Sequence, residues 1–241
     1  MYYLMYMETK VTMINHEHKF IFLHIPKCAG TSVGQTLKDI AVNDPNEWHA
    51  YACNGEHHVN PYGDLHCKEF GPERHFDIFD EQMWKDYFVF TFTRNPWDRM
   101  VSHYKFRHQD FGVTQGFDYF VKNFESLCEK WSDENDLYGE RILLPSQTDF
   151  LRGTFDYNIQ GKGIDYRKYI DFYGKFENLQ EDFDTILNRI GDFSHTSYDG
   201  LWHRNKSEYI IDDWRTMYTQ ELREYVAHKY SEDIMGFNYS F

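Results

Sequence analysis

The sequence predicts an α/β fold with a central, mainly parallel β-sheet flanked by helices. Two observations carry this prediction: apolar runs at residues 20–25 and 87–93 are each followed by a short loop and a helical pattern. Strands that alternate with helices in this order usually lie parallel in one sheet. With 241 residues, we expect an N-terminal extension at residues 1–18 and a single domain at residues 19–241.

The first of these units carries a loop rich in small and hydroxyl-bearing residues. The first N–H groups of a helix lack intrahelical acceptors and the helix dipole adds positive charge there, so such a loop suits an anion. Gly30 lets the backbone approach a ligand, and Lys27 adds a mobile cation. Because Lys27 precedes Gly30, the loop is not a Walker A motif; the alternative is an ordinary strand-to-helix turn. The loop reads His24-Ile25-Pro26-Lys27-Cys28-Ala29-Gly30-Thr31-Ser32.

The second unit places Arg94 directly after the strand predicted at residues 87–93. A guanidinium supplies paired donors that match phosphate oxygens, and Ser102, about two helical turns along, adds a hydroxyl. Asn95 is expected to cap the helix between them. This pattern predicts a second anion site; the alternative interpretation makes Arg94 a surface residue paired with Asp98.

Later segments continue the alternation of helices and strands. Apolar residues recur at helical spacing within residues 116–131, 179–190 and 214–230. Residues 169–173 predict a further strand before the second of these helices. The second half of the chain therefore extends the same α/β pattern.

Composition and charge narrow the classes of function. The formal net charge of −14 argues against a general affinity for nucleic acid or anionic membranes, so an anionic ligand must be held by local donors. Four cysteines are too few for a disulfide scaffold, which favours a reducing compartment. No run approaches the ~20 apolar residues that span a bilayer, and the polar start is unlike a secretory signal. We therefore expect a cytoplasmic enzyme without a membrane span.

Together the two motifs resemble those of the sulfotransferases that use 3′-phosphoadenosine 5′-phosphosulfate (PAPS), especially the carbohydrate, Golgi-type branch of sulfotransferase family 2. The resemblance implies a three-layer, P-loop-like fold. It also implies that a sulfuryl group moves from PAPS to an acceptor hydroxyl, first of all on a carbohydrate, and that the bisphosphate product PAP is released. Lys27 is then catalytic as well as cofactor-binding. The cofactor-binding residues implied are Lys27, Cys28, Ala29, Gly30, Thr31, Ser32, Arg94, Ser102, Arg204, Lys206 and Ser207.

The region between the two motifs is irregular and rich in histidine. In the resembled family this region commonly supplies a His or Glu that acts as the general base. His66 is the first candidate for this catalytic role, with His57, His58 and His75 as rivals. Cys53 and Cys67 lie in the same region, yet neither a Cys-x-x-Cys nor a His-x-x-x-His pair is present, so we expect no metal.

Two further residues have roles that the resemblance suggests. The block at residues 144–151 resembles one near the acceptor cleft of the carbohydrate enzymes, which makes Gln147 a candidate acceptor contact. Its alternative interpretation is a turn followed by a packed pair, Phe150 and Leu151. Arg99, in the helix that follows Arg94, is expected to be structural.

Other functions remain open on the sequence alone. The chain could be a catalytically silent protein that binds a nucleotide or a glycan on the same fold, although Lys27 disfavours this. A small alcohol or a phenol could replace the carbohydrate acceptor. A nucleotide kinase is disfavoured because the Walker A lysine position is missing, and a zinc-dependent interaction module is the weakest alternative.

Overall fold

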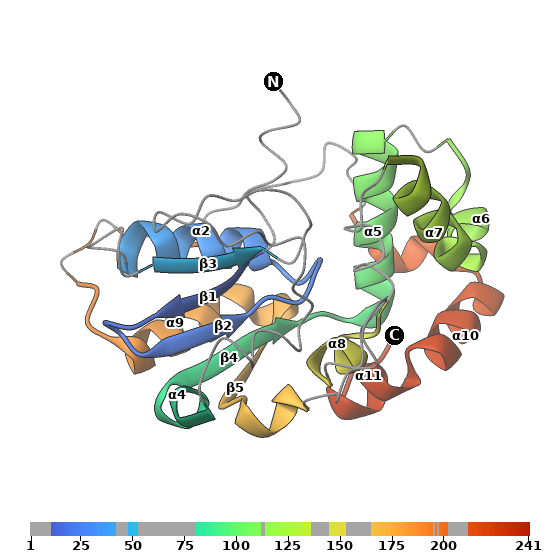
Figure 1. Ribbon diagram of the computed structural model, residues 1–241. Helices are drawn as coiled ribbons and strands as arrows, with labels where there is room; N and C mark the ends of the chain where they lie inside the picture. Colours follow the sequence, from blue (N-terminus) through green and yellow to red (C-terminus); the bar gives the residue numbers. More distant parts are fainter. Residues whose placement is uncertain are drawn as a thin grey trace. The chain divides into compact units, whose positions relative to one another are not determined.

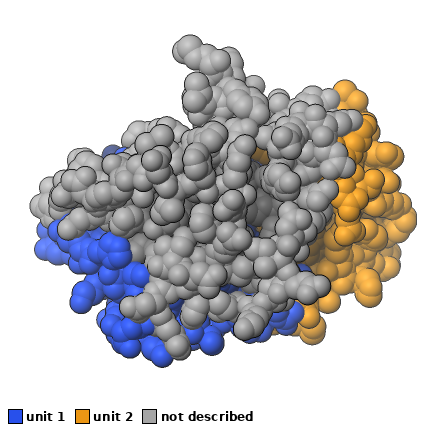
Figure 2. Space-filling model, viewed as in Figure 1, with its two compact units in different colours: residues 1–93, 149–204 blue, residues 94–148, 205–241 orange. Residues whose placement is uncertain are grey.

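The structure is a computed structural model that describes residues 11–41, 48–52, 81–111, 114–135, 145–152, 165–194, 196, 198–201 and 212–241. The chain divides into two compact units (Figure 2). The first comprises residues 1–93 and 149–204, and the second comprises residues 94–148 and 205–241. The sheet belongs to the first unit, and most of the second is helical.

A five-stranded sheet forms the centre of the first unit (Figure 1). β2, β4 and β5 pair in parallel, and β1 pairs antiparallel with both β2 and β3. β3 therefore points the same way as β2, so four of these five strands share one direction. The predicted α/β fold with a mainly parallel sheet is confirmed. The strand order is β3 (Trp48–Ala52), β1 (Val11–Asn15), β2 (Phe20–Leu23), β4 (Phe88–Thr93) and β5 (Phe172–Lys175).

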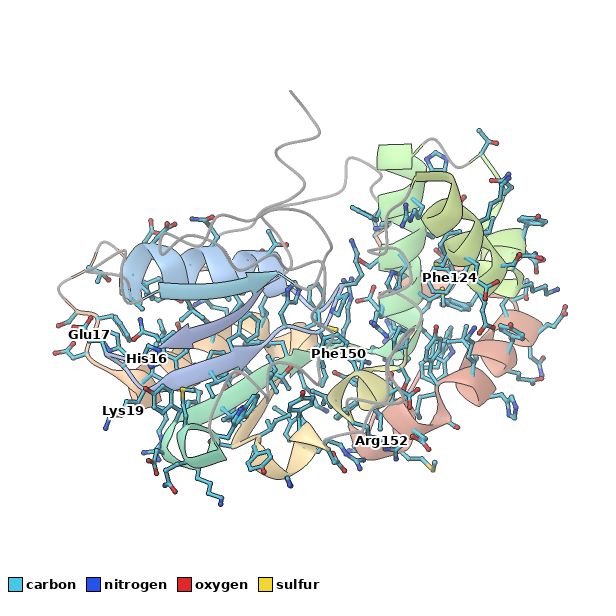
Figure 3. All side chains as sticks on the ribbon, viewed as in Figure 1. His16, Glu17, Lys19, Phe124, Phe150 and Arg152 are labelled. Atoms are coloured by element: carbon cyan, nitrogen blue, oxygen red, sulfur yellow. The ribbon has the colours of Figure 1, made fainter. Side chains whose placement is uncertain are left out.

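The expected N-terminal extension at residues 1–18 includes a strand of this sheet, β1. A turn joins β1 to β2, and Figure 3 labels His16, Glu17 and Lys19 in it. The Asn15 side chain orders the turn, because its Oδ1 accepts the His18 N–H at 2.7 Å and its Nδ2 donates to the Ala41 carbonyl at 2.8 Å. The sequence does not predict this short strand, because its five residues show no clear alternation of apolar and polar side chains.

The core of the first unit is built on β2 and β4. Their side chains are almost entirely buried, and the rings of Phe22 and Phe90 stack with centroids 5.2 Å apart. Helices α2 (Gly30–Ala41) and α9 (Leu179–Ile190) flank the sheet (Figure 1) and bury the apolar faces that the sequence predicts. The remaining short helices are α4 (Glu81–Asp86), η5 (Tyr166–Tyr169) and η6 (Phe176–Asn178).

Parallel pairing brings the carboxyl ends of three strands to one edge of the sheet. Leu23 of β2 pairs with Thr91 of β4, which in turn pairs with Tyr173 of β5. The Thr91 hydroxyl donates to the Leu23 carbonyl at 2.7 Å and so fixes the end of β2. Ligands of open α/β sheets usually bind outside this carboxyl edge, and both predicted anion motifs begin where one of these strands ends.

The second unit packs helices around aromatic side chains. Tyr104 contacts Phe117 and Phe120 edge-on, with ring centroids 5.3 and 5.2 Å apart. The helix predicted at residues 116–131 is two helices, because the backbone leaves helical geometry at Asn123, with φ of −112° and ψ of 12°. The Asn123 side chain donates to the Tyr119 carbonyl at this end. The elements are α5 (Pro96–Phe111), α6 (Phe117–Lys122), α7 (Phe124–Asn135), α8 (Gln147–Leu151, which the unit boundary crosses), η7 (Trp214–Met217), α10 (Gln220–Lys229) and α11 (Ser231–Gly236).

Within the described ranges, every helix is too short or too polar to cross a lipid bilayer.

Candidate functional site

The first predicted anion motif is a turn at residues 26–29 that joins β2 to α2. The Cys28 N–H donates to the Ile25 carbonyl at 3.3 Å, and the Val33 N–H donates to the Ala29 carbonyl at 3.1 Å. Cys28 is fully buried, with its thiol directed at the Pro26 carbonyl 3.7 Å away. The Cys28 thiol therefore lies in the core, and the Cys28 N–H is engaged by the Ile25 carbonyl.

The backbone of this turn has an unusual conformation. Lys27 and Ala29 both have φ of 66°, in the left-handed region, whereas Cys28 between them does not have a positive φ. Left-handed residues next to right-handed ones can direct successive N–H groups into a concavity that binds anions. We call residues 27–29, with left-handed φ at both ends, the nest. Left-handed conformation costs about 1–2 kcal/mol for a residue other than glycine. The sequence does not predict this nest, because Lys and Ala rarely adopt that conformation.

The His24 ring leaves no room for a side chain at position 30. A Cβ on Gly30 would lie 1.8 Å from the Cδ2 atom of His24. The His24 ring is 8% exposed and stacks on Phe22 with centroids 6.0 Å apart, so it has little room to move. The imidazole thus occupies the space that a side chain at position 30 would need. The role of Gly30 in admitting a ligand stays a prediction, whereas its contact with His24 is observed.

Helix α2 begins where the turn ends. The N–H groups of Gly30, Thr31 and Ser32 belong to its first turn, which lacks intrahelical acceptors. The first turn contains no acidic residue, so no carboxylate of α2 competes there with an anion. The nest and the helix N-terminus are consecutive in the chain and together form the candidate site of the first unit.

The second predicted motif begins α5 in the second unit. The Asn95 side chain accepts the Trp97 N–H at 3.1 Å, which confirms the predicted cap. The Arg94 Nε donates to Asp98 Oδ2 at 2.8 Å, as the alternative interpretation required. However, both side chains are only 13% exposed, so Arg94 is a partly buried, fixed residue and not a surface one.

The face of α5 that contains Asp98 also carries Ser102 and Lys105, at the spacing i, i+4 and i+7. Burial lowers the pKa of Lys105; its neighbour Asp98 raises this pKa and Arg94 lowers it further. Lys105 therefore lies close enough to Arg94 to interact with it electrostatically, although no sequence pattern singles Lys105 out. Ser102 and Lys105 of α5, with Arg94 just before the helix, place two cations and a hydroxyl in the same part of the second unit.

The backbone of Arg94 is held by Gln147. Its N–H donates to Gln147 Oε1, and its carbonyl accepts from Gln147 Nε2, both at 2.8 Å. Gln147 is fully buried, so the structure gives this side chain a different environment from the acceptor contact that the sequence suggested. Arg99 is 3% exposed and donates to the Pro145 carbonyl at 3.1 Å, in line with its expected structural role.

Several predicted residues lie outside the part of the chain that the structure describes. These are the candidate bases, the two cysteines near them, and the predicted cofactor contacts near the C-terminus. Among the described residues, no group of three or more His, Cys, Asp or Glu side chains is placed to hold a metal ion. The residues outside are His57, His58, His66, His75, Cys53, Cys67, Arg204, Lys206 and Ser207.

Comparison with known proteins connects both motifs to one family. The model of the sulfotransferase family matches residues 10–139, which include the turn and α5. Carbohydrate sulfotransferase 14 of Danio rerio is 22% identical over 94% of this chain, which spans 61% of that relative's length. An uncharacterized protein of Archaeoglobus fulgidus is 30% identical over 46% of this chain and 73% of its own length. No solved structure gives a significant match.

Proposed function

The chain belongs to the sulfotransferase family, and from this membership we propose that it transfers the sulfuryl group of PAPS to an acceptor hydroxyl. The observation that carries the proposal is the left-handed backbone at Lys27 and Ala29, which leads directly into the N-terminus of α2. Both features favour an anion, and the protein's net charge of −14 means that local donors must supply the attraction.

We assign the two ends of the nucleotide to the two motifs. Residues 27–32 bind the 5′-phosphosulfate end through backbone N–H groups and hydroxyls. Arg94 and Ser102 bind the 3′-phosphate, with Arg94 preorganised by Asp98 and Gln147. Arg204, Lys206 and Ser207 are proposed as further contacts to the nucleotide.

The proposed transfer runs in line. The acceptor oxygen forms a bond to sulfur while the bond from sulfur to the 5′-phosphate oxygen breaks, and the acceptor's proton passes to a base, for which His66 is our candidate. Lys27 neutralises the charge that grows on the departing phosphate oxygen, and PAP leaves. A sulfuryl group carries less charge than a terminal phosphate, so this scheme requires no Mg²⁺.

The acceptor is proposed to be a hydroxyl of a carbohydrate. The Danio rerio relative is named as a carbohydrate sulfotransferase, and aromatic residues, 19% of this chain, suit stacking on sugar faces. A small alcohol or a phenol is the alternative acceptor. The chain has only four cysteines, too few for a disulfide scaffold, which supports the proposal that the enzyme works in a reducing compartment such as the cytoplasm.

Calorimetric titration tests the donor site. We expect the protein to bind adenosine 3′,5′-bisphosphate at least tenfold more tightly than adenosine 5′-monophosphate, since a charge-assisted hydrogen bond contributes about 1.5–3 kcal/mol. Arg94→Ala should remove this preference. Lys27→Ala should keep most of the affinity for the bisphosphate but lose turnover with PAPS and a saccharide acceptor. Equal affinity for the two nucleotides, or no binding of either, would contradict the proposed donor site.

A further inference from the structure

The carboxamide of Gln147 forms a two-bond clamp on the backbone of Arg94. Gln147 Oε1 accepts the Arg94 N–H at 2.8 Å, and Gln147 Nε2 donates to the Arg94 carbonyl at 2.8 Å. Gln147 lies 53 positions along the chain from Arg94, and both residues belong to the second unit. The clamp acts on the first of the two residues between the end of β4 and the start of α5. The Arg94 backbone is therefore held by a residue that is distant in the sequence.

A buried carboxylate on α11 orients the clamp. Asp233 Oδ2 accepts the Gln147 N–H at 2.8 Å and Gln147 Nε2 at 3.2 Å, and Asp233 Oδ1 accepts the Thr148 N–H at 2.7 Å. Asp233 and Gln147 are both 0% exposed. The two hydrogens of Gln147 Nε2 thus point to two acceptors, which leaves Oε1 facing the one donor, the Arg94 N–H. The carboxamide has a single satisfactory orientation.

The chemistry of this network suits positioning. A buried carboxylate is costly unless several donors satisfy it, and here three N–H groups do so. Satisfied buried networks rigidify what they touch. At the other end of Arg94, Asp98 holds the guanidinium at Nε. The residue is therefore fixed both at its backbone and at its side chain.

We propose that Gln147 and Asp233 are positioning residues for Arg94, and that the relay Asp233–Gln147–Arg94 aims the guanidinium at the 3′-phosphate of the nucleotide. This rests on the proposed function, in which Arg94 binds that phosphate. In this proposal Gln147 supports nucleotide binding by holding the Arg94 backbone, and it does not contact the acceptor.

Two readouts test the relay on the full chain, with Gln147→Met and Asp233→Asn as variants. Thr148→Val is the matched control, because Thr148 is 4% exposed on the same short helix and its hydroxyl has no hydrogen-bond partner among the described residues. The first readout is hydrogen exchange of the Arg94 amide by NMR, with the Arg99 amide, which donates to the Asn95 carbonyl, as the internal reference. The second is the affinity for adenosine 3′,5′-bisphosphate and for adenosine 5′-monophosphate.

We expect Gln147→Met and Asp233→Asn to speed exchange of the Arg94 amide at least about tenfold relative to the Arg99 amide. Both should weaken bisphosphate binding by about tenfold and monophosphate binding by less than about twofold. Thr148→Val should change neither readout. In an Arg94→Ala background, Gln147→Met should cause no further loss of bisphosphate affinity, because its effect passes through Arg94.

The possible results distinguish failure of the relay from failure of the proposed function. If the unaltered protein shows no preference for the bisphosphate, the donor site is wrong, and the exchange readout still decides whether Gln147 holds Arg94. If that preference exists but Gln147→Met leaves it intact, or weakens binding equally with and without Arg94, the relay is wrong. Equal exchange of the Arg94 amide in all variants would also overturn it.

Discussion

Lys27 and Ala29 show how single residues shape the candidate site. Each holds φ of 66°, a conformation that glycine adopts at no steric cost. Strained backbone of this kind persists only where the surrounding structure enforces it, and it concentrates at binding sites. The side chain of Cys28, between them, is fully buried, so the middle of the turn is anchored in the core.

The strain at Ala29 gives a prediction about stability. Ala29→Gly should raise the free energy of unfolding by up to about 1 kcal/mol, since relief of the left-handed strain exceeds the entropy that glycine adds to the unfolded chain. The same change at Ala227, inside α10, should lower it by about 1 kcal/mol. Urea denaturation of both variants measures the two signs. A loss at position 29 as large as that at position 227 would mean that the turn is not left-handed there.

At the scale of elements, one contact joins the end of β2 to the start of α2. His24 directly follows β2, and Gly30 is the first residue of α2. The His24 ring lies against Gly30. The sequence predicted the strand, the loop and the helix, because apolar period and turn residues are local signals. It could not predict the ring-to-glycine contact, which depends on the rotamer of a side chain six positions away.

Gly30→Ala should therefore lower the free energy of unfolding by about 1–3 kcal/mol, because the new methyl group overlaps the His24 ring. His24→Ala in the same chain should recover part of that loss, which a double-mutant cycle measures as a favourable coupling. Gly116→Ala is the control, since a Cβ there meets nothing within 4 Å. Purely additive effects at positions 24 and 30 would argue against the contact.

In the second motif, too, the sequence predicts the contacts between residues close in the chain but not those between distant residues. Asn95 as a cap and Asp98 as a partner of Arg94 follow from their spacing in the sequence, and both are found. Gln147 and Asp233 act on Arg94 from 53 and 139 positions away, so no periodic pattern or local motif connects them. The roles of residues as donors to a nucleotide stay predictions, since they depend on a ligand as well as on the fold.

At the scale of the whole molecule, a cysteine thiol and three tyrosine hydroxyls should make the free energy of unfolding fall at alkaline pH. Burial raises the pKa of Cys128 from 9.0 to about 12 and is the main cause that raises the pKa of Tyr198 from 10.0 to about 12. Burial also raises the pKa values of Tyr218 and Tyr230. In each case the folded protein keeps a proton that the unfolded chain releases at lower pH.

The sign of the pH dependence follows from this difference. Below pH 9 both states hold these protons, so the free energy of unfolding should not change through these groups. Above about pH 9 the unfolded chain loses the Cys128 proton first and the tyrosine protons from about pH 10, while the folded state retains them. The free energy of unfolding should then fall by about 1.4 kcal/mol per pH unit for each fully buried group.

Denaturant titrations between pH 8 and pH 11 measure this fall. Cys128→Ala should reduce the slope from about pH 9, and Tyr230→Phe should reduce it only from about pH 10, because each variant removes one titrating group with its own onset. The two variants serve as controls for each other, since both residues are buried in the same unit. A free energy of unfolding that stays constant to pH 11 would show that these side chains reach water in the folded protein.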